Sequence, residues 1–196
     1  MSNQRASKVN RIAGLAILIA MVVVLQIIGS FINFGSFSVS LVLVPIVIGA
    51  ALYGADAGAI LGAVFGVVVL LNCINGTDQG GYILWAANPF ATAILCLLKG
   101  ALAGLLAGTV YSTLSKKNAI LGAIAAAIVC PLTNTGIFIG AMLVIYKDIL
   151  VVWAGNNALL YYALMGLAGA NFALEMAINV ILSPAILRII KTVKGE

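Results

Sequence analysis

Long apolar runs, repeated along almost the whole chain, most limit what this protein can fold into. A helix that crosses a membrane needs about 20 apolar residues, and lipid accepts only helices or closed barrels as spanning structures. The runs cover residues 12–28, 41–52, 57–71, 89–114, 119–145 and 158–190. The sequence therefore predicts an all-α, polytopic membrane protein: a six-helix transmembrane bundle in one domain, residues 1–196. Because the second and third runs are short, four spans is the main alternative.

Composition supports this class and excludes several functions. Hydrophobic residues make up 64% of the 196 residues and charged residues 8%, against about 45–50% and about 25% in soluble domains. The chain has no histidine, which excludes His-based acid–base catalysis and His metal sites. Cys73, Cys96 and Cys130 match no metal or disulfide spacing. We expect no catalytic residue, metal or cofactor, and without a P-loop any ATP must be hydrolysed by another chain.

The basic residues predict the orientation. With the N-terminus inside, the outer loops carry only Lys147, and the cytoplasmic side carries the remaining basic residues that flank spans: Arg5, Lys8, Arg11, Lys116, Lys117, Arg188, Lys191 and Lys194. This asymmetry follows the positive-inside rule, so both termini are predicted to be cytoplasmic. The charged start could also begin a signal peptide, but its apolar run is long and no small-x-small cleavage site follows.

Aromatic and polar side chains gather near the predicted outer interface. The aromatic residues there are Tyr82, Trp85, Tyr146, Trp153, Tyr161 and Tyr162. An aromatic belt explains some of them, but the inner side has little beyond Tyr53 and Tyr111, which favours an outward-facing binding pocket. The polar segment 72–82 is either a solvated loop or a flexible lid over this pocket. Asn88-Pro89 after it has the pattern of a helix start.

Lys99 and Glu175 each fall near the middle of a predicted span. A charge at that depth costs about 2.5–3.5 kcal/mol on insertion scales and is usually paired or functional. One interpretation is a structural ion pair that joins the fourth and sixth spans. The other is that Lys99 offers a cation to an anionic ligand.

Polar residues interrupt the fifth and sixth spans. Asn134 follows Pro131, and it either repairs the proline kink or presents an amide to a ligand. Asn171, Glu175 and Asn179 are spaced four apart, so they form one helix face. This polar stripe must face the protein interior or water.

Small residues recur every four positions in three of the runs. Glycines do so at 58, 62 and 66 and again at 100, 104 and 108, which favours close helix packing within the bundle. Ala16 and Ala20 have the same spacing in the first run. For this pair a groove that accepts another protein is the alternative to internal packing.

In their order and in the chain length, these features resemble the substrate-binding S component of energy-coupling factor (ECF) vitamin transporters, closest to the pantothenate-like branch. The resemblance is carried by Ala16-x-x-x-Ala20, by VPIVIGAALYG at 44–54, by GAILGAVFG at 58–66 and by KGALAGLLAG at 99–108. It covers the whole chain. It implies a subunit that binds a water-soluble vitamin at the extracellular side, docks on a membrane scaffold with two ABC ATPases, and topples to release its substrate inside.

The resemblance also implies the site. Ala16 and Ala20 would contact the scaffold subunit, and the pocket would form from the outer halves of spans four to six with nearby loops. Pantothenate-type members are expected to use a basic residue on span four, where this chain has Cys96, with Lys99 one turn away. From the resemblance and the polar patterns together, the predicted substrate-binding residues are Asn75, Asp78, Tyr82, Trp85, Asn88, Lys99, Asn134, Trp153, Asn157, Asn171 and Glu175.

Pantothenate is the favoured substrate, with riboflavin or another vitamin as alternatives. A second hypothesis is a self-sufficient secondary transporter or facilitator of a small polar solute, a class that often shows internal repeats. The two halves of the chain show no convincing repeat. An intramembrane enzyme is disfavoured, because the chain has no histidine and no clear nucleophile–base pair.

Overall fold

The computed structural model describes residues 2–30, 33–34, 37–38 and 42–194, and in this part the chain is almost wholly helical. One short hairpin pairs β1 (Asn33–Phe34) with β2 (Phe37–Ser38). The helices, in chain order, are α1 (Ser2–Gly29), α2 (Leu43–Tyr53), α3 (Ala55–Asn75), α4 (Gln79–Ala87), α5 (Pro89–Leu114), α6 (Ala119–Val144), α7 (Lys147–Ala154), α8 (Leu159–Tyr161), the π-helix η1 (Tyr162–Gly169) and α9 (Ala170–Lys194). The predicted all-α membrane fold is confirmed.

Five helical segments are long and apolar enough to cross a membrane: Val9–Gly29, Ala55–Asn75, Pro89–Leu114, Ala119–Val144 and Asn171–Val193. Helix α2, which corresponds to the predicted second span, has only 11 residues. At 1.5 Å per residue it is about 16 Å long, roughly half of a bilayer core of about 30 Å. It is nonetheless almost completely buried. The second apolar run is therefore a buried half-length helix, and its predicted first residue, Leu41, lies outside the described residues.

Side-chain caps fix where two of the long helices begin. The Asn88 side chain accepts a hydrogen bond of 3.0 Å from the Ala91 backbone N–H, and Pro89 occupies the first turn of α5. Asn118 caps α6 in the same way, with bonds of 2.9 and 3.1 Å from the N–H groups of Ile120 and Leu121. Asn is among the best N-cap residues, so the predicted start at Asn88-Pro89 is confirmed.

Glycines let α3 and α5 pack backbone against backbone. A Cβ atom added at Gly58 would collide with the carbonyl oxygen of Gly104, and one added at Gly62 would collide with that of Gly100. At Gly66 the obstacle would be the carbonyl of Cys96. The two glycine series thus face each other, which confirms the prediction that they serve packing within the bundle.

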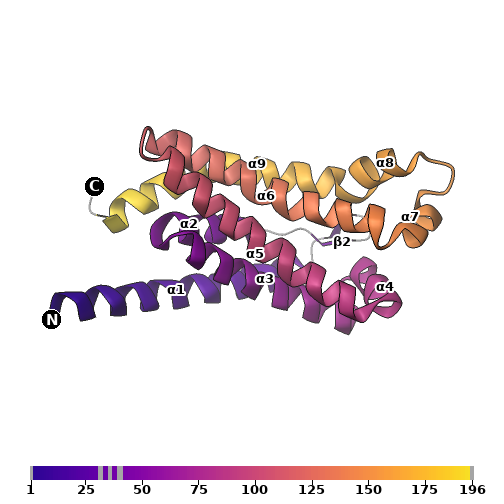
Figure 1. Ribbon diagram of the computed structural model, residues 1–196, viewed down its shortest axis with the longest axis horizontal. Helices are drawn as coiled ribbons and strands as arrows, with labels where there is room; N and C mark the ends of the chain where they lie inside the picture. The colour runs from indigo at the N-terminus through magenta and orange to yellow at the C-terminus, as the bar shows by residue number, and fades with distance from the viewer. Residues whose placement is uncertain (1, 31–32, 35–36, 39–41, 195–196) are drawn as a thin grey trace.

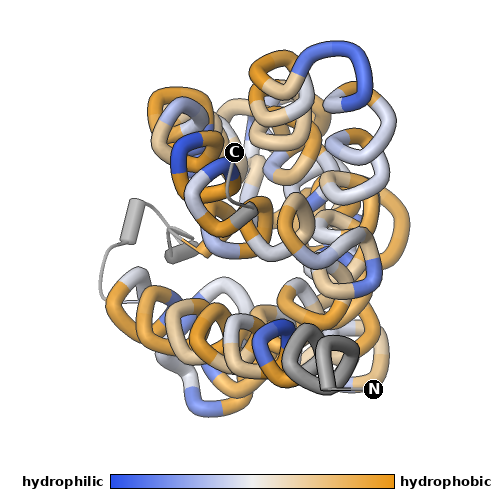
Figure 2. Tube along the Cα trace, turned by 90° about the vertical axis from the view of Figure 1, so that its left-hand side faces the viewer, coloured by the Kyte–Doolittle hydropathy of each residue, from blue (hydrophilic) through white to orange (hydrophobic). Residues whose placement is uncertain are grey.

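The helices form a bundle with both termini at one end (Figure 1). The opposite end carries α4, α7 and α8. Figure 2 looks onto the end with the termini and shows that most residues along the helices are hydrophobic or neutral, with short hydrophilic segments between them. The predicted outer-side aromatics Tyr82, Trp85, Trp153 and Tyr161 belong to α4, α7 and α8, far from the termini.

Two predicted connections need correction. The segment 72–82 is not a loop: α3 continues to Asn75, and α4 begins at Gln79 after a short turn. Asp78 starts α4 by accepting a 2.8 Å bond from the Gly81 N–H, and Gly81 itself packs against the Cys73 side chain. The connection after the fifth span likewise contains α7. Both helices are only eight or nine residues long, too short for an apolar period to reveal.

The predicted sixth span is one run of helix with an irregular N-terminal part. From Tyr162 to Gly169 it is π-helical before α9 continues. Together, α8 and η1 meet α7 at 91°. Helical bulges of this kind are frequent at functional sites, and η1 and the start of α9 do line a pocket.

Candidate functional site

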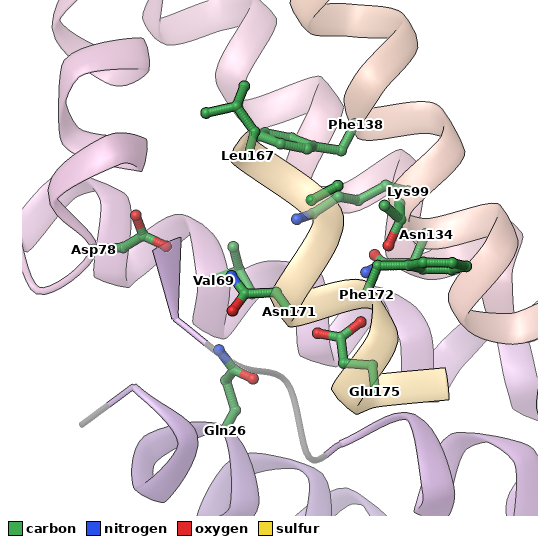
Figure 3. Close-up of a pocket in the computed structure, with 12 residues that line it drawn as sticks. Gln26, Val69, Asp78, Lys99, Asn134, Phe138, Leu167, Asn171, Phe172 and Glu175 are labelled. Carbon is green, nitrogen blue, oxygen red and sulfur yellow. The ribbon is translucent and has the colours of Figure 1, made fainter. Parts of the chain in front are cut away.

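A pocket lies between α1, α3, α5, α6, η1 and α9, with about 540 Å³ of space that is partly open to solvent (Figure 3). Its lining mixes polar and apolar side chains: Gln26, Val69, Asp78, Lys99, Asn134, Thr135, Phe138, Leu167, Ala168, Asn171, Phe172 and Glu175. Converging polar groups in an otherwise apolar cavity are typical of ligand sites.

Lys99 supplies the cation of this pocket. Its side chain is half-buried on α5, and its ammonium nitrogen lies 5.5 Å from the centre of the Phe138 ring on α6. In Figure 3 the ammonium group points toward the side where Asp78 lies rather than toward the carboxylate of Glu175. A cation over an aromatic face is stabilised by about 0.5–2 kcal/mol without being neutralised. The lysine can therefore still attract an anion.

Among the amide oxygens of the pocket, those of Gln26 and Asn134 have no hydrogen-bond donor within the described residues. Gln26 Oε1 and Asn134 Oδ1 are buried, and no donor among the described residues reaches either atom. An unpaired buried acceptor costs about 1–3 kcal/mol. Such a cost is recovered when a bound molecule or a water donates to the oxygen. For Asn134, its place in the pocket favours the ligand-facing interpretation over repair of the Pro131 kink.

The polar stripe of α9 faces inward, as predicted. Glu175 and Asn179 are 5% and 1% exposed, and Asn171 lines the pocket with Glu175. The Asn179 amide donates a 2.8 Å bond to the backbone carbonyl of Glu175. Within the stripe, Asn179 is the member that does not line the pocket.

A second, mostly apolar lobe adjoins the first, with about 310 Å³ of space. The two lobes share Val69, Asp78, Lys99 and Phe138. The second lobe extends to Cys96 and Thr92 on α5. The combined site thus has the Lys99 cation and the Asp78 carboxylate where the lobes meet, a first lobe that mixes polar and apolar groups, and a mostly apolar second lobe.

The family follows from a comparison with known proteins. The model of a family described as "ECF transporter, substrate-specific component" matches residues 10–187. The chain belongs to this family. It is a subunit of a transporter, a multi-pass membrane protein, and the hypothesis of an ECF S component is confirmed over that of a secondary transporter.

Individual relatives agree with the family. The chain is 29% identical to the pantothenic acid transporter PanT of Lactococcus lactis subsp. cremoris (strain MG1363), over 93% of this chain and 94% of that protein. A solved structure of ThiT from Listeria monocytogenes superposes with a TM-score of 0.63 at 24% identity, covering 92% of this chain and 98% of that one. The latter likeness supports the all-helical fold of this S component.

Five predicted site residues of the S component meet in the pocket: Asp78, Lys99, Asn134, Asn171 and Glu175. Six others do not line it: Asn75, Tyr82, Trp85, Asn88, Trp153 and Asn157. Several of these have structural roles. Asn88 caps α5, and Asn157 donates a 3.0 Å bond to the carbonyl of Ala154. Trp85 and Trp153 are half-buried and pack against the two hydrophobic cores.

Part of the pocket lining was not predicted from the sequence. Its apolar members, such as Phe138 and Phe172, carry no signal that separates them from core residues. Thr135 lies beside Asn134 in the polar interruption of the fifth span. Gln26 did have a signal, because it is the one polar side chain between residues 12 and 28. A polar group inside a span is expensive and usually functional.

The predicted docking pair lies on the outside of the S component. Ala16 and Ala20 are exposed on α1, and Ala20 lines a shallow apolar groove with Ile17, Met21 and Val24. Small residues on such a face allow another helix to come close.

Proposed function

We propose that this S component binds pantothenate, with Lys99 as the group that holds its carboxylate. The observation that carries the proposal is the Lys99 ammonium group in a pocket of the membrane domain, over the Phe138 ring. The similarity to PanT supports the same substrate. A half-buried lysine attracts an anion more strongly than a lysine on the solvated surface, because fewer water molecules screen the pair.

The position of Lys99 also accounts for a departure from the pattern expected of pantothenate-type members. Cys96 stands where an arginine is expected, and it lines the second lobe together with Lys99. A carboxylate drawn into this lobe would be in reach of the lysine one turn farther along α5. The polar amides of the first lobe, Gln26 and Asn134, suit the amide and hydroxyl groups of pantothenate.

Transport itself requires partners. We propose that the pocket opens to the extracellular side of a bacterial cytoplasmic membrane, with both termini inside. The face of α1 around Ala16 and Ala20 would dock on a scaffold subunit that carries two ABC ATPases. Docking would topple the loaded S component and release its substrate into the cell.

The test is calorimetric binding of the purified chain in mild detergent to a panel of pantothenate, riboflavin, folate, thiamine, biotin, niacin and pyridoxine. Tight one-to-one binding of pantothenate alone is expected. Tight binding of a different vitamin would overturn the substrate, and binding of none by a folded sample would overturn the assignment of the pocket. Uptake that persists without the ATPase module would contradict the proposed coupling.

A further inference from the structure

Gln26 is a polar residue of the pocket that comes from the first helix. It lies near the C-terminal end of α1 and is 1% exposed. Its side chain lines the pocket together with Lys99 and Asn134. In Figure 3, Gln26 and Lys99 approach the pocket from opposite sides.

The direction of Gln26 is fixed by the packing of α1. Leu18, Val22 and Gln26 are spaced four apart and are all buried, so they form the inner face of the helix. Ala16, Ala20 and Val24 lie on the exposed side. Gln26 therefore cannot turn to lipid or solvent without breaking the contacts of this face.

The side-chain oxygen of Gln26 lacks a hydrogen-bond donor among the described residues. No donor within the described part of the chain reaches Gln26 Oε1, although the atom is buried. Because the pocket is the open space beside it, a bound molecule is the natural source of the missing donor. A carboxylate cannot donate, so the group that meets Gln26 is a hydroxyl or an amide N–H.

We infer that Gln26 determines substrate specificity by accepting a hydrogen bond from a hydroxyl group remote from the substrate's carboxylate. The inference rests on the proposed function and adds an orientation to it: carboxylate at Lys99, hydroxyl end at Gln26. Sites built to bond a hydroxyl reject analogues that lack it, because their own polar group is then left unpaired. The selectivity of this pocket thus depends on a residue of the first helix.

The experiment measures affinities of the full chain in detergent for pantothenate and for its two mono-deoxy analogues, each lacking one hydroxyl. The wild type is expected to bind one analogue about tenfold more weakly, the effect of one hydrogen bond of about 1.4 kcal/mol. Gln26→Met keeps the length of the side chain but removes the acceptor. It should bind pantothenate about tenfold more weakly and no longer distinguish that analogue from pantothenate.

Two further variants keep the result interpretable. Asn179→Leu removes another buried amide whose oxygen lacks a described donor, but outside the pocket, so it should retain the discrimination. Gln26→Glu retains an acceptor oxygen and should also discriminate, which tests the inference if Gln26→Met does not fold.

The outcomes separate the inference from the proposed function. A wild type that binds no pantothenate overturns the proposed function and, with it, the inference. A wild type that binds pantothenate but treats both analogues alike overturns the inference alone. A folded Gln26→Met variant that still distinguishes the analogue from pantothenate also overturns the inference alone. So does a folded Gln26→Glu variant that no longer distinguishes them.

Discussion

The ammonium nitrogen of Lys99 on α5 lies 5.5 Å from the centre of the Phe138 ring on α6. This contact joins two helices that also border the pocket, so it orients the cation toward the space where a ligand would sit. An aromatic face lowers the cost of a buried cation without neutralising its charge. The arrangement is suited to a site that must hold a cation when empty and bind an anion when full.

Removal of the Lys99 side chain should weaken the binding of acidic ligands only. We expect Lys99→Ala to weaken pantothenate binding by about 10- to 100-fold, the equivalent of about 1.5–3 kcal/mol for a bond to a charged group. Calorimetry with the alcohol in which CH₂OH replaces the carboxylate should give nearly unchanged affinity. Lys117→Ala, at an exposed turn, is the matched control.

A different result would favour the structural interpretation of Lys99. If Lys99→Ala fails to fold and a second change, Glu175→Gln, restores folding, the two charges stabilise each other in the bundle. Equal losses for the acid and the alcohol would also contradict a role in charge recognition.

Bulk on the exposed face of α1 should block assembly. Ala16→Trp and Ala20→Trp each place a large ring where a neighbouring helix would need close approach. Co-purification with the scaffold and ATPase subunits is expected to be lost, while pantothenate binding by the isolated chain remains. Ile181→Trp on α9, where the residue is 73% exposed, should keep both properties. Retained co-purification of the Ala16 and Ala20 variants would contradict the docking face.

A single methyl group at the contact of α3 with α5 should destabilise the fold. Gly62→Ala would drive its Cβ into the Gly100 carbonyl, and overpacking of this kind costs about 1–3 kcal/mol. Thermal unfolding in detergent should show a lower midpoint. Gly140→Ala on α6 meets nothing within 4 Å, so it should be neutral or stabilising by up to about 1 kcal/mol. Similar midpoints for the two variants would argue against tight glycine packing.

Tyr146 should make stability depend on alkaline pH. Its hydroxyl lies 2.7 Å from that of Thr92, and burial raises its pKa above the ordinary value of 10.0, although the bond to Thr92 partly opposes this. A raised pKa means that the fold favours the neutral phenol. The stabilisation of the fold by the neutral Tyr146 phenol is therefore complete below about pH 10, near the pKa of tyrosine in the unfolded chain. It is lost as the pH rises through the higher pKa of Tyr146 in the folded state.

The variant Tyr146→Phe isolates this effect. It should unfold at a lower temperature than the wild type at neutral pH, because the hydrogen bond to Thr92 is gone. Above about pH 10, its stability should fall less steeply than that of the wild type. Parallel pH profiles in melting experiments would show that Tyr146 does not contribute.

Helix positions that depend on local signals could be predicted from the sequence. The start at Asn88-Pro89 combines a capping side chain with a proline in the first turn, and α5 spans the predicted residues 89–114. The short helices α4 and α7 could not be predicted, because eight or nine residues at an interface show no clear period. At Gly80-Gly81 the composition favours a loop, yet Gly81 lies in a helix, where a Cβ atom would collide with the Cys73 sulfur unless that side chain moved.

The sequence by itself determined the membrane class, the long helices, the clustering of basic residues at the helix ends, and the inward direction of the α9 stripe, because each depends on residue type and on spacing along one helix. Only the tertiary structure decided which helix faces meet. It brings Gln26 of α1 into one pocket with Lys99 of α5 and Asn134 of α6, while Asn88 is used as a cap. Such contacts join residues far apart in the chain, and a helical period gives the direction of a side chain but not its partner.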